Sequence, residues 1–211
     1  MQNLSEIVKQ WPVVNGWSVA PKAFPFCKKG TRLIVRGNWA TIGNWATIGD
    51  EAKIGDEARI GNGARIGNAA TIGNWAKIGN AATIGNWATI GDEATIGDEA
   101  RIGNGARIGN AATIGNWAKI GDEAKIGSWA TIGNWAKIGD WAADTINLGF
   151  ADGFAVHLAQ VEGVAFIGGG CKWLNIDNAI AYVTGRPERA EMLDRVLYAA
   201  TIADRKGWRR S

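Results

Sequence analysis

The chain has 211 residues, of which 46% are apolar and 20% are charged, and its formal net charge is +3. This composition is that of a folded protein and gives no sign of disorder. The net charge is too small to indicate a nucleic-acid partner, so we expect none. We also expect a cytoplasmic protein without a membrane span, because no segment approaches 18 apolar residues and no secretion signal opens the chain.

Residues 1–35 are expected to form an N-terminal cap. Leu4, Ile7 and Val8 predict a short amphipathic helix that begins after Asn3 and ends before Pro12. Residues 12–35 are rich in proline and aromatic residues and end in an apolar run. Such a segment can cover the unpaired strand edge at the end of a repeat structure and prevent end-to-end association.

Residues 36–143 contain a six-residue repeat. Isoleucine occupies every sixth position from Ile42 to Ile138, followed by Gly, then Asn, Asp or Ser, a variable residue, Ala, and Thr, Lys or Arg. A period of six does not fit a helix, whereas an even period keeps side chains on one side of an extended chain. We predict that Ile and Ala point inward and that Thr, Lys and Arg point outward. Asn or Asp and the variable residue after it are expected to turn the corners, and Asn and Asp suit these corners because they tolerate left-handed backbone conformations.

This unit resembles the hexapeptide repeat of left-handed parallel β-helices. The resemblance implies an all-β solenoid with three hexads per coil, and residues 36–143 then supply about six triangular coils. Related left-handed helices commonly form trimers, so the resemblance also implies a homo-oligomer, with a trimer favoured.

A longer repeat lies within the coils. Residues 38–79 recur as residues 80–121 with two changes, Trp39 to Ala81 and Lys53 to Thr95. Forty-two residues are seven hexads, which is not a multiple of three, so the second copy is rotated by one face of the solenoid. This rotation argues against a site built on one face. A threonine ladder of the ice-binding kind is also excluded, because the outward residues in the row that begins at Thr47 are mixed. That row contains Thr47, Arg65, Thr83, Arg101, Lys119 and Lys137.

Tryptophan is frequent at the variable corner position. The corner tryptophans are Trp39, Trp45, Trp75, Trp87, Trp117, Trp129, Trp135 and Trp141. Exposed indoles are costly unless they cover other groups or meet a partner. Stacking between adjacent coils is the favoured interpretation, because Trp45, Trp87 and Trp117 lie 18 residues before Gly63, Gly105 and Trp135, which they are expected to cover. A protein or ligand interface is the alternative.

Residues 144–211 have a different composition and are expected to form a ββαα cap or an oligomerisation unit. Residues 153–160 and 164–167 predict two strands, residues 176–184 a short helix, and Pro187 the start of a second helix that ends near Gly207. From Gly153 onward, including Gly170, Cys171, Lys172 and Trp173, the segment resembles tails of uncharacterised phage and alphaproteobacterial hexapeptide-repeat proteins. The resemblance implies a phage-encoded protein in the host cytoplasm.

Many hexapeptide-repeat proteins are acyltransferases that use coenzyme A thioesters, with a histidine beside the coils as the catalytic base. This chain has one histidine, His157, which lies beyond the last hexad. We interpret it as a strand residue and only a weak catalytic candidate. The coil carboxylates are expected to pair with neighbouring Lys and Arg, which would make them poor proton acceptors. No metal site is expected, because one histidine and the isolated Cys27 and Cys171 give no ligand pattern.

The remaining site candidate lies in the C-terminal segment. Its candidate ligand-binding residues are Trp173, Arg186, Arg189, Arg195 and Arg205. Arginines can hold a small anionic ligand, particularly in a cleft between subunits. The alternative is a solvated helix face with positive charge near its C-terminus.

The sequence alone therefore predicts a non-enzymatic binding or structural β-helix without a cofactor. Two alternatives remain open. One is a phage protein that sequesters a small nucleotide-like anion at subunit interfaces, and the other is a coenzyme A-dependent acyltransferase.

Overall fold

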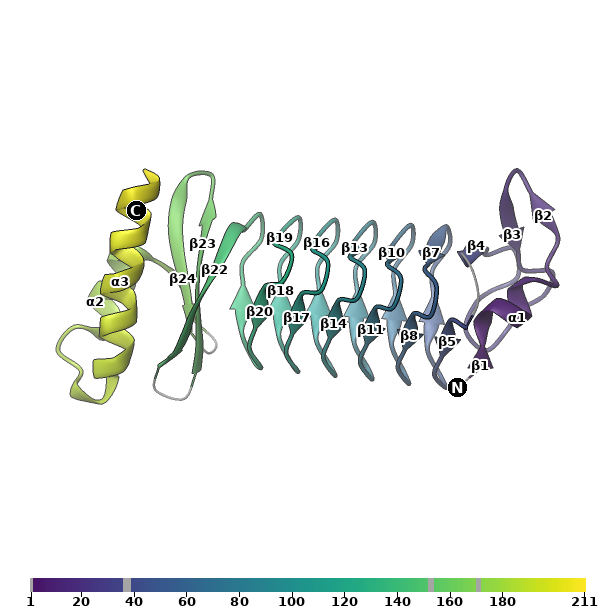
Figure 1. Ribbon diagram of the computed structural model, residues 1–211, viewed down its shortest axis with the longest axis horizontal. Coiled ribbons are helices and arrows are strands. Elements are labelled where there is room, and N and C mark those ends of the chain that lie inside the picture. Colours follow the sequence, from purple (N-terminus) through teal and green to yellow (C-terminus); the bar gives the residue numbers. More distant parts are fainter. Residues whose placement is uncertain (1, 36–38, 152–153, 170–171) are drawn as a thin grey trace.

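In the computed structural model, the repeat coils form a straight rod with the N-terminal elements at one end and a sheet-and-helix unit at the other (Figure 1). The structure describes residues 2–35, 39–151, 154–169 and 172–211. No helix in this described part of the chain is long and apolar enough to cross a lipid bilayer.

The repeat builds three parallel sheets, one on each face of a triangular β-helix. The first face contains β5 (Thr41–Ile42), β8 (Arg59–Ile60), β11 (Lys77–Ile78), β14 (Thr95–Ile96), β17 (Thr113–Ile114) and β20 (Thr131–Ile132). The second face contains β4 (Arg32–Val35), β7 (Ala52–Ile54), β10 (Thr71–Ile72), β13 (Thr89–Ile90), β16 (Arg107–Ile108) and β19 (Lys125–Ile126). The third face contains β6 (Thr47–Ile48), β9 (Arg65–Ile66), β12 (Thr83–Ile84), β15 (Arg101–Ile102), β18 (Lys119–Ile120) and β21 (Lys137–Ile138).

The register confirms three hexads per coil, because Ile90 pairs with Ile72 on one side and with Ile108 on the other. Every described repeat isoleucine is at most 4% exposed, and the alanines before them form a second buried ladder. The predicted inward positions are therefore confirmed. The core is a column of stacked isoleucine and alanine layers that no single coil could bury alone.

The corners differ from the sequence-based expectation. The left-handed conformation falls on the variable residue, as at Trp45 (φ 56°) and Glu99 (φ 56°), and not on the Asn or Asp before it. The Asn or Asp side chain instead accepts a hydrogen bond from the preceding coil, as when the Asn44 amide donates to Asn62 Oδ1 at 2.8 Å. The prediction that Asn and Asp supply left-handed backbone was wrong because it overlooked this backbone donor, which would otherwise lack a protein partner.

The glycine after each isoleucine is required by the closeness of the next coil. A Cβ atom placed on Gly109 would lie 2.4 Å from the Ser128 nitrogen and 2.6 Å from the Gly127 carbonyl carbon, both backbone atoms. Gly127 lies one coil further along the same face, and a Cβ there would meet nothing within 4 Å. The two glycines therefore occupy equivalent positions on one face, but only Gly109 is covered by a following coil.

We expect Gly109→Ala to lower the free energy of unfolding by about 1 to 3 kcal/mol, because backbone cannot move aside as a side chain can. Gly127→Ala should change it by less than about 1 kcal/mol, because its Cβ would point into open space. Denaturant unfolding of both variants measures the difference. Equal losses in the two variants would contradict the close approach of coils at Gly109.

The N-terminal elements close one end of the core. They are β1 (Gln2–Asn3), α1 (Leu4–Val8), β2 (Val13–Val14) and β3 (Trp17–Val19). The predicted short helix is present, with Asn3 as its N-cap. β1 pairs antiparallel with β5, and β3 pairs with β4, so the first coil has no bare edge at these strands. Leu4, Leu33 and Phe26 are buried against the first coil.

The C-terminal unit is an antiparallel sheet followed by helices. It comprises β22 (Ala143–Ala151), β23 (Phe154–Val161), β24 (Val164–Gly169), β25 (Lys172–Asn175), α2 (Ile176–Val183), the 3-10 turn η1 (Pro187–Arg189) and α3 (Ala190–Lys206). The sequence predicted both helices and two of these four strands, β23 and β24. The others were missed because β22 continues directly from the last hexad and β25 is only four residues long. Gly153, Gly170 and Cys171 lie outside the described residues.

Both faces of this sheet are covered by other elements. Successive side chains along each strand point to opposite faces, so each strand contributes residues to both. Ala159 and Trp173 contribute to the core of the coils. Leu158, Ile167 and Leu174 contribute to a second core beneath α2 and α3. The sheet therefore closes the last coil with one face and carries the helices on the other (Figure 1).

Candidate functional site

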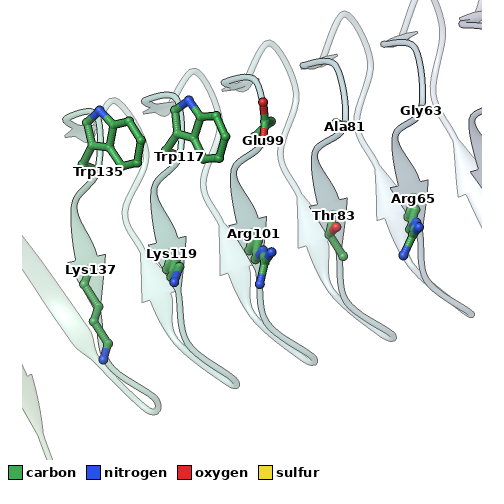
Figure 2. Close-up of a pocket in the computed structure, with 10 residues that line it drawn as sticks. All are labelled: Gly63, Arg65, Ala81, Thr83, Glu99, Arg101, Trp117, Lys119, Trp135 and Lys137. Carbon is green, nitrogen blue, oxygen red and sulfur yellow. The ribbon is translucent and has the colours of Figure 1, made fainter. Parts of the chain in front are cut away.

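A groove of about 1110 Å³ runs along the third face of the β-helix. Figure 2 shows its two parallel rows of residues, one on the strands and one at the corners, with one member of each row per coil. The strand row is Arg65, Thr83, Arg101, Lys119 and Lys137. The corner row is Gly63, Ala81, Glu99, Trp117 and Trp135. We refer to these ten residues as the third-face groove.

Four cations occupy the strand row of the groove. Arg65, Arg101, Lys119 and Lys137 point outward and have no salt bridge within 4 Å among the described residues. Adjacent coils are about 4.8 Å apart, so the row extends about 19 Å along the rod. An unpaired row of this length can bind several anionic groups of one extended ligand.

The corner row changes from small residues to aromatic ones along the rod. Trp117 and Trp135 stack with ring centroids 4.9 Å apart and an interplanar angle of 4°. Gly63 and Ala81 have little or no side chain at the other end of the row, whereas the two large indole rings project from their corners beside the strands (Figure 2). The groove therefore combines a flat aromatic edge with the cationic row.

Stacking accounts for few of the corner tryptophans. Among the described residues, Trp117 and Trp135 are the one stacked pair of corner indoles. The six other corner indoles are 53% to 84% exposed, and Trp45, which was expected to cover Gly63, is the most exposed of them. The stacking interpretation is confirmed for Trp117 and Trp135 and is wrong for most other corners, where the residue 18 positions along the chain is not a tryptophan.

Glu99 is the carboxylate that lines the third-face groove. Among the described residues, no salt bridge within 4 Å involves Glu99, whereas Asp50 and Glu51 both pair with Arg32. The expectation that the coil carboxylates are paired is therefore wrong at Glu99.

The 42-residue duplication is rotated by one face, as predicted. Glu99 and Arg101 lie in the third-face groove, whereas their duplicates Glu57 and Arg59 lie on or beside the first face. The rotation does not prevent a site on one face, because the third face carries four outward cations and the first face only two, Arg59 and Lys77. The sequence contained this row, but spacing alone did not indicate a groove.

His157 lies on β23 between the sheet and the last coil and is 1% exposed. Its Nε2 accepts a long hydrogen bond of 3.4 Å from the Gly133 amide, and Nδ1 has no partner in the described part of the chain. Burial lowers the pKa of His157 to about 4, because the charged imidazolium loses its hydration. This imidazole is buried between the sheet and the last coil, so a substrate on the coil surface cannot reach it.

The predicted ligand-binding residues do not come together within one chain. Trp173 faces the coils, where it stacks on Phe166 at 5.8 Å and lies against Gly139. The arginines belong to the helical side of the sheet: Arg186 lies over the Tyr182 ring, Arg189 is in η1, and Arg195 and Arg205 are on α3. The β-sheet separates Trp173 from these arginines, so a site that uses both needs another subunit.

No group of three metal-ligating side chains occurs among the described residues. Cys27 is partly buried beside Phe24, and burial raises the pKa of its thiol. A thiol with a raised pKa is a weak nucleophile at neutral pH. The third-face groove is therefore the site with the clearest chemistry.

Comparison with known families matches residues 76–110 and 105–140 to the model described as "Bacterial transferase hexapeptide (six repeats)". The chain is a hexapeptide-repeat β-helix protein. A search of the curated proteins found no significant match.

The chain is similar to solved structures over about half of its length. The acetyltransferase domain of PglB from Neisseria gonorrhoeae is 22% identical, with 54% of each chain covered and a TM-score of 0.50. PerB from Caulobacter crescentus, solved with CoA and GDP-perosamine, is 19% identical, with 53% of each chain covered and a TM-score of 0.49. The hexapeptide-repeat protein thus spans about half the length of these proteins.

These findings correct the functional prediction from the sequence. The prediction of a non-enzymatic binding or structural protein was wrong, because the family model that matches the coils is described as one of bacterial transferases. Phage origin and ligand sequestration also receive no support from them. The prediction failed because it required a histidine beside the coils and dismissed the coil carboxylates as paired, which is wrong at Glu99.

Proposed function

We propose that this hexapeptide-repeat protein is a coenzyme A-dependent acyltransferase that binds the thioester along the third-face groove. The observation that carries the proposal is the groove itself, which places four unpaired cations, a stacked indole pair and one carboxylate on one face of the fold. The match to a transferase family model supports the same class of reaction.

The groove suits the chemistry of coenzyme A. This substrate carries several phosphate charges at one end and an uncharged pantetheine arm that ends in the thioester. Arg101, Lys119 and Lys137 can hold phosphate oxygens by charge-assisted hydrogen bonds. The exposed edge of the Trp117 and Trp135 pair can pack against the adenine ring, because stacking on an aromatic side chain is favourable for any base.

Glu99 is the proposed general base. It lines the groove between Ala81 and Trp117 in the corner row, and no other residue of the groove can accept a proton at neutral pH. In the reaction, an acceptor amine or hydroxyl attacks the thioester carbonyl carbon while its proton passes to the Glu99 carboxylate. The tetrahedral intermediate then breaks its carbon–sulfur bond, and the coenzyme A thiolate leaves and takes up a proton.

His157 has no catalytic role in this proposal. It is buried beneath the sheet, and its imidazole contacts the Gly133 amide of the last coil. We infer instead that it packs the junction between the coils and the C-terminal sheet.

We also propose a homotrimer, in keeping with the family resemblance. Seven corner indoles that are at least half exposed support this assembly, because a monomer rarely leaves so much aromatic surface in water. Sedimentation at micromolar concentration should give a species three times the 22.4 kDa mass of one chain. A species of 22.4 kDa alone would contradict the trimer.

The reaction is tested by following release of the coenzyme A thiol from acetyl coenzyme A in the presence of a panel of amine and hydroxyl acceptors. We expect the wild type to consume thioester with at least one acceptor. Glu99→Gln should lower the rate by about 10² to 10⁴, the usual cost of losing a general base. His157→Asn should leave the turnover rate of the folded protein unchanged.

The duplication supplies a matched control. Glu57 is the copy of Glu99 in the first repeat and has the same local sequence, but it lies outside the third-face groove. Glu57→Gln should therefore retain full activity. Absence of thioester consumption with every acceptor, or equal losses in Glu57→Gln and Glu99→Gln, would contradict the proposed function.

A further inference from the structure

A second cavity lies on the helical side of the C-terminal sheet, away from the third-face groove. It has a volume of about 120 Å³ and is enclosed by β24, β25, α2, η1 and α3. Its floor is formed by the buried side chains of Ile167, Ala179, Val183, Met192 and Val196. The floor is therefore entirely apolar.

The mouth of the cavity is cationic. Lys172 and Tyr182 line it, with the Lys172 ammonium 5.4 Å from the centre of the Tyr182 ring. The Arg186 guanidinium lies 4.4 Å from the centre of the same ring. Neither Lys172 nor Arg186 has a salt bridge within 4 Å among the described residues. Lys172 and Arg189 thus line the entrance to an apolar hollow, and Arg186 lies over the Tyr182 ring beside it.

Water is a poor occupant of such a space. A volume of 120 Å³ corresponds to about four water molecules at ~30 Å³ each, and each would need two or more polar partners. The apolar floor offers no side-chain partner. A short hydrocarbon or phenyl group can instead fill the floor, and a negative charge at its outer end would meet Lys172.

We propose that this cavity, which we name the cap pocket, binds a small organic acid whose short apolar or aromatic body enters the floor and whose carboxylate remains at the mouth. The size of the cavity limits the apolar part to a few carbon atoms beyond the carboxylate. This inference is independent of the acyltransferase proposal, because it shares no residue with the third-face groove.

Isothermal titration of the full-length chain tests the proposal with hexanoate and benzoate as probes. The neutral analogues hexanol and benzyl alcohol report the contribution of the carboxylate. We expect saturable binding of at least one acid at about millimolar concentration, the range open to a ligand of this size. The matching alcohol should bind about tenfold more weakly or not at all.

Variants separate the two parts of the pocket. Ala179→Leu should fill the floor and abolish binding, and Lys172→Gln should weaken binding of the acid about tenfold without affecting the alcohol. Lys206→Gln is the matched control, because Lys206 lies 5.1 Å from the centre of the Trp208 ring in the same unit but does not line the pocket.

Three outcomes would overturn the proposal. They are no saturable binding of either acid, equal affinity for acid and alcohol, and equal weakening by Lys172→Gln and Lys206→Gln. Should Ala179→Leu fail to fold, the Lys172→Gln and Lys206→Gln comparison still decides whether the acid binds at this mouth.

Discussion

Replacing Ile90 with alanine should lower the free energy of unfolding by about 2 to 5 kcal/mol. Ile90 is 1% exposed in the middle of the stack, and its strand pairs with the strands of Ile72 and Ile108. The substitution removes buried methyl and methylene groups and leaves a cavity. Neighbouring coils cannot collapse into that cavity, because their backbones are held by hydrogen bonds such as that from the Thr89 amide to the Ala106 carbonyl.

Thr89→Ala is the control for this prediction. Thr89 precedes Ile90 on β13, but its side chain points outward and is exposed. The control should change stability by less than about 0.5 kcal/mol, as most exposed substitutions do. Denaturant unfolding gives both values. A loss below about 0.5 kcal/mol in Ile90→Ala would show that the isoleucine column does not stabilise the coils.

Acidification should destabilise the protein through His157. The pKa of this histidine falls from 6.5 to about 4 on folding, because burial disfavours the charged form. The unfolded chain therefore binds a proton below pH 6.5 that the folded chain does not bind until about pH 4. Neutral His157 therefore contributes its full stabilisation above pH 6.5. A pKa shift of this size corresponds to a loss of about 3 kcal/mol in the free energy of unfolding as the pH falls to about 4.

Unfolding curves of wild type and His157→Asn across this pH range provide the measurement. The wild type should lose about 3 kcal/mol more than the variant between pH 7 and pH 4, because asparagine does not titrate. Asp50 and Asp204 do not confuse the result, since the pKa of each carboxyl is lowered below 3.8 and their contributions are lost at lower pH. Parallel pH dependences for the two proteins would refute the buried, neutral state of His157.

Much of the fold could be predicted from the sequence because the repeat leaves few alternatives. The isoleucine period of six predicted the inward face. The family resemblance supplied three hexads per coil, and the rotation of the duplicated segment follows from that number. The C-terminal sheet was only half predicted, since strands such as β25 depend on tertiary pairing with β24 more than on local pattern.

The candidate site was harder to predict than the fold. The row of Arg65, Arg101, Lys119 and Lys137 can be read from the spacing, but the depth of the groove depends on the corner conformations. Left-handed backbone at each variable residue sets the direction of Trp117 and Glu99, and no residue preference at that position signals it. The sequence also could not show that Glu99 is free of a salt bridge, because pairing depends on where side chains of different coils project.

The most direct test of the third-face groove as the thioester site is the affinity for coenzyme A of two variants related by the duplication. Lys119→Ala removes a cation from the groove, and Lys77→Ala removes its copy from the first face. Loss of a charge-assisted hydrogen bond usually costs about 1.5 to 3 kcal/mol, or about 10-fold to 100-fold in affinity. We predict that Lys119→Ala binds coenzyme A more weakly by this factor and that Lys77→Ala binds it with wild-type affinity. Equal affinities of the two variants, or no measurable binding of coenzyme A to the wild type, would contradict the assignment of the groove.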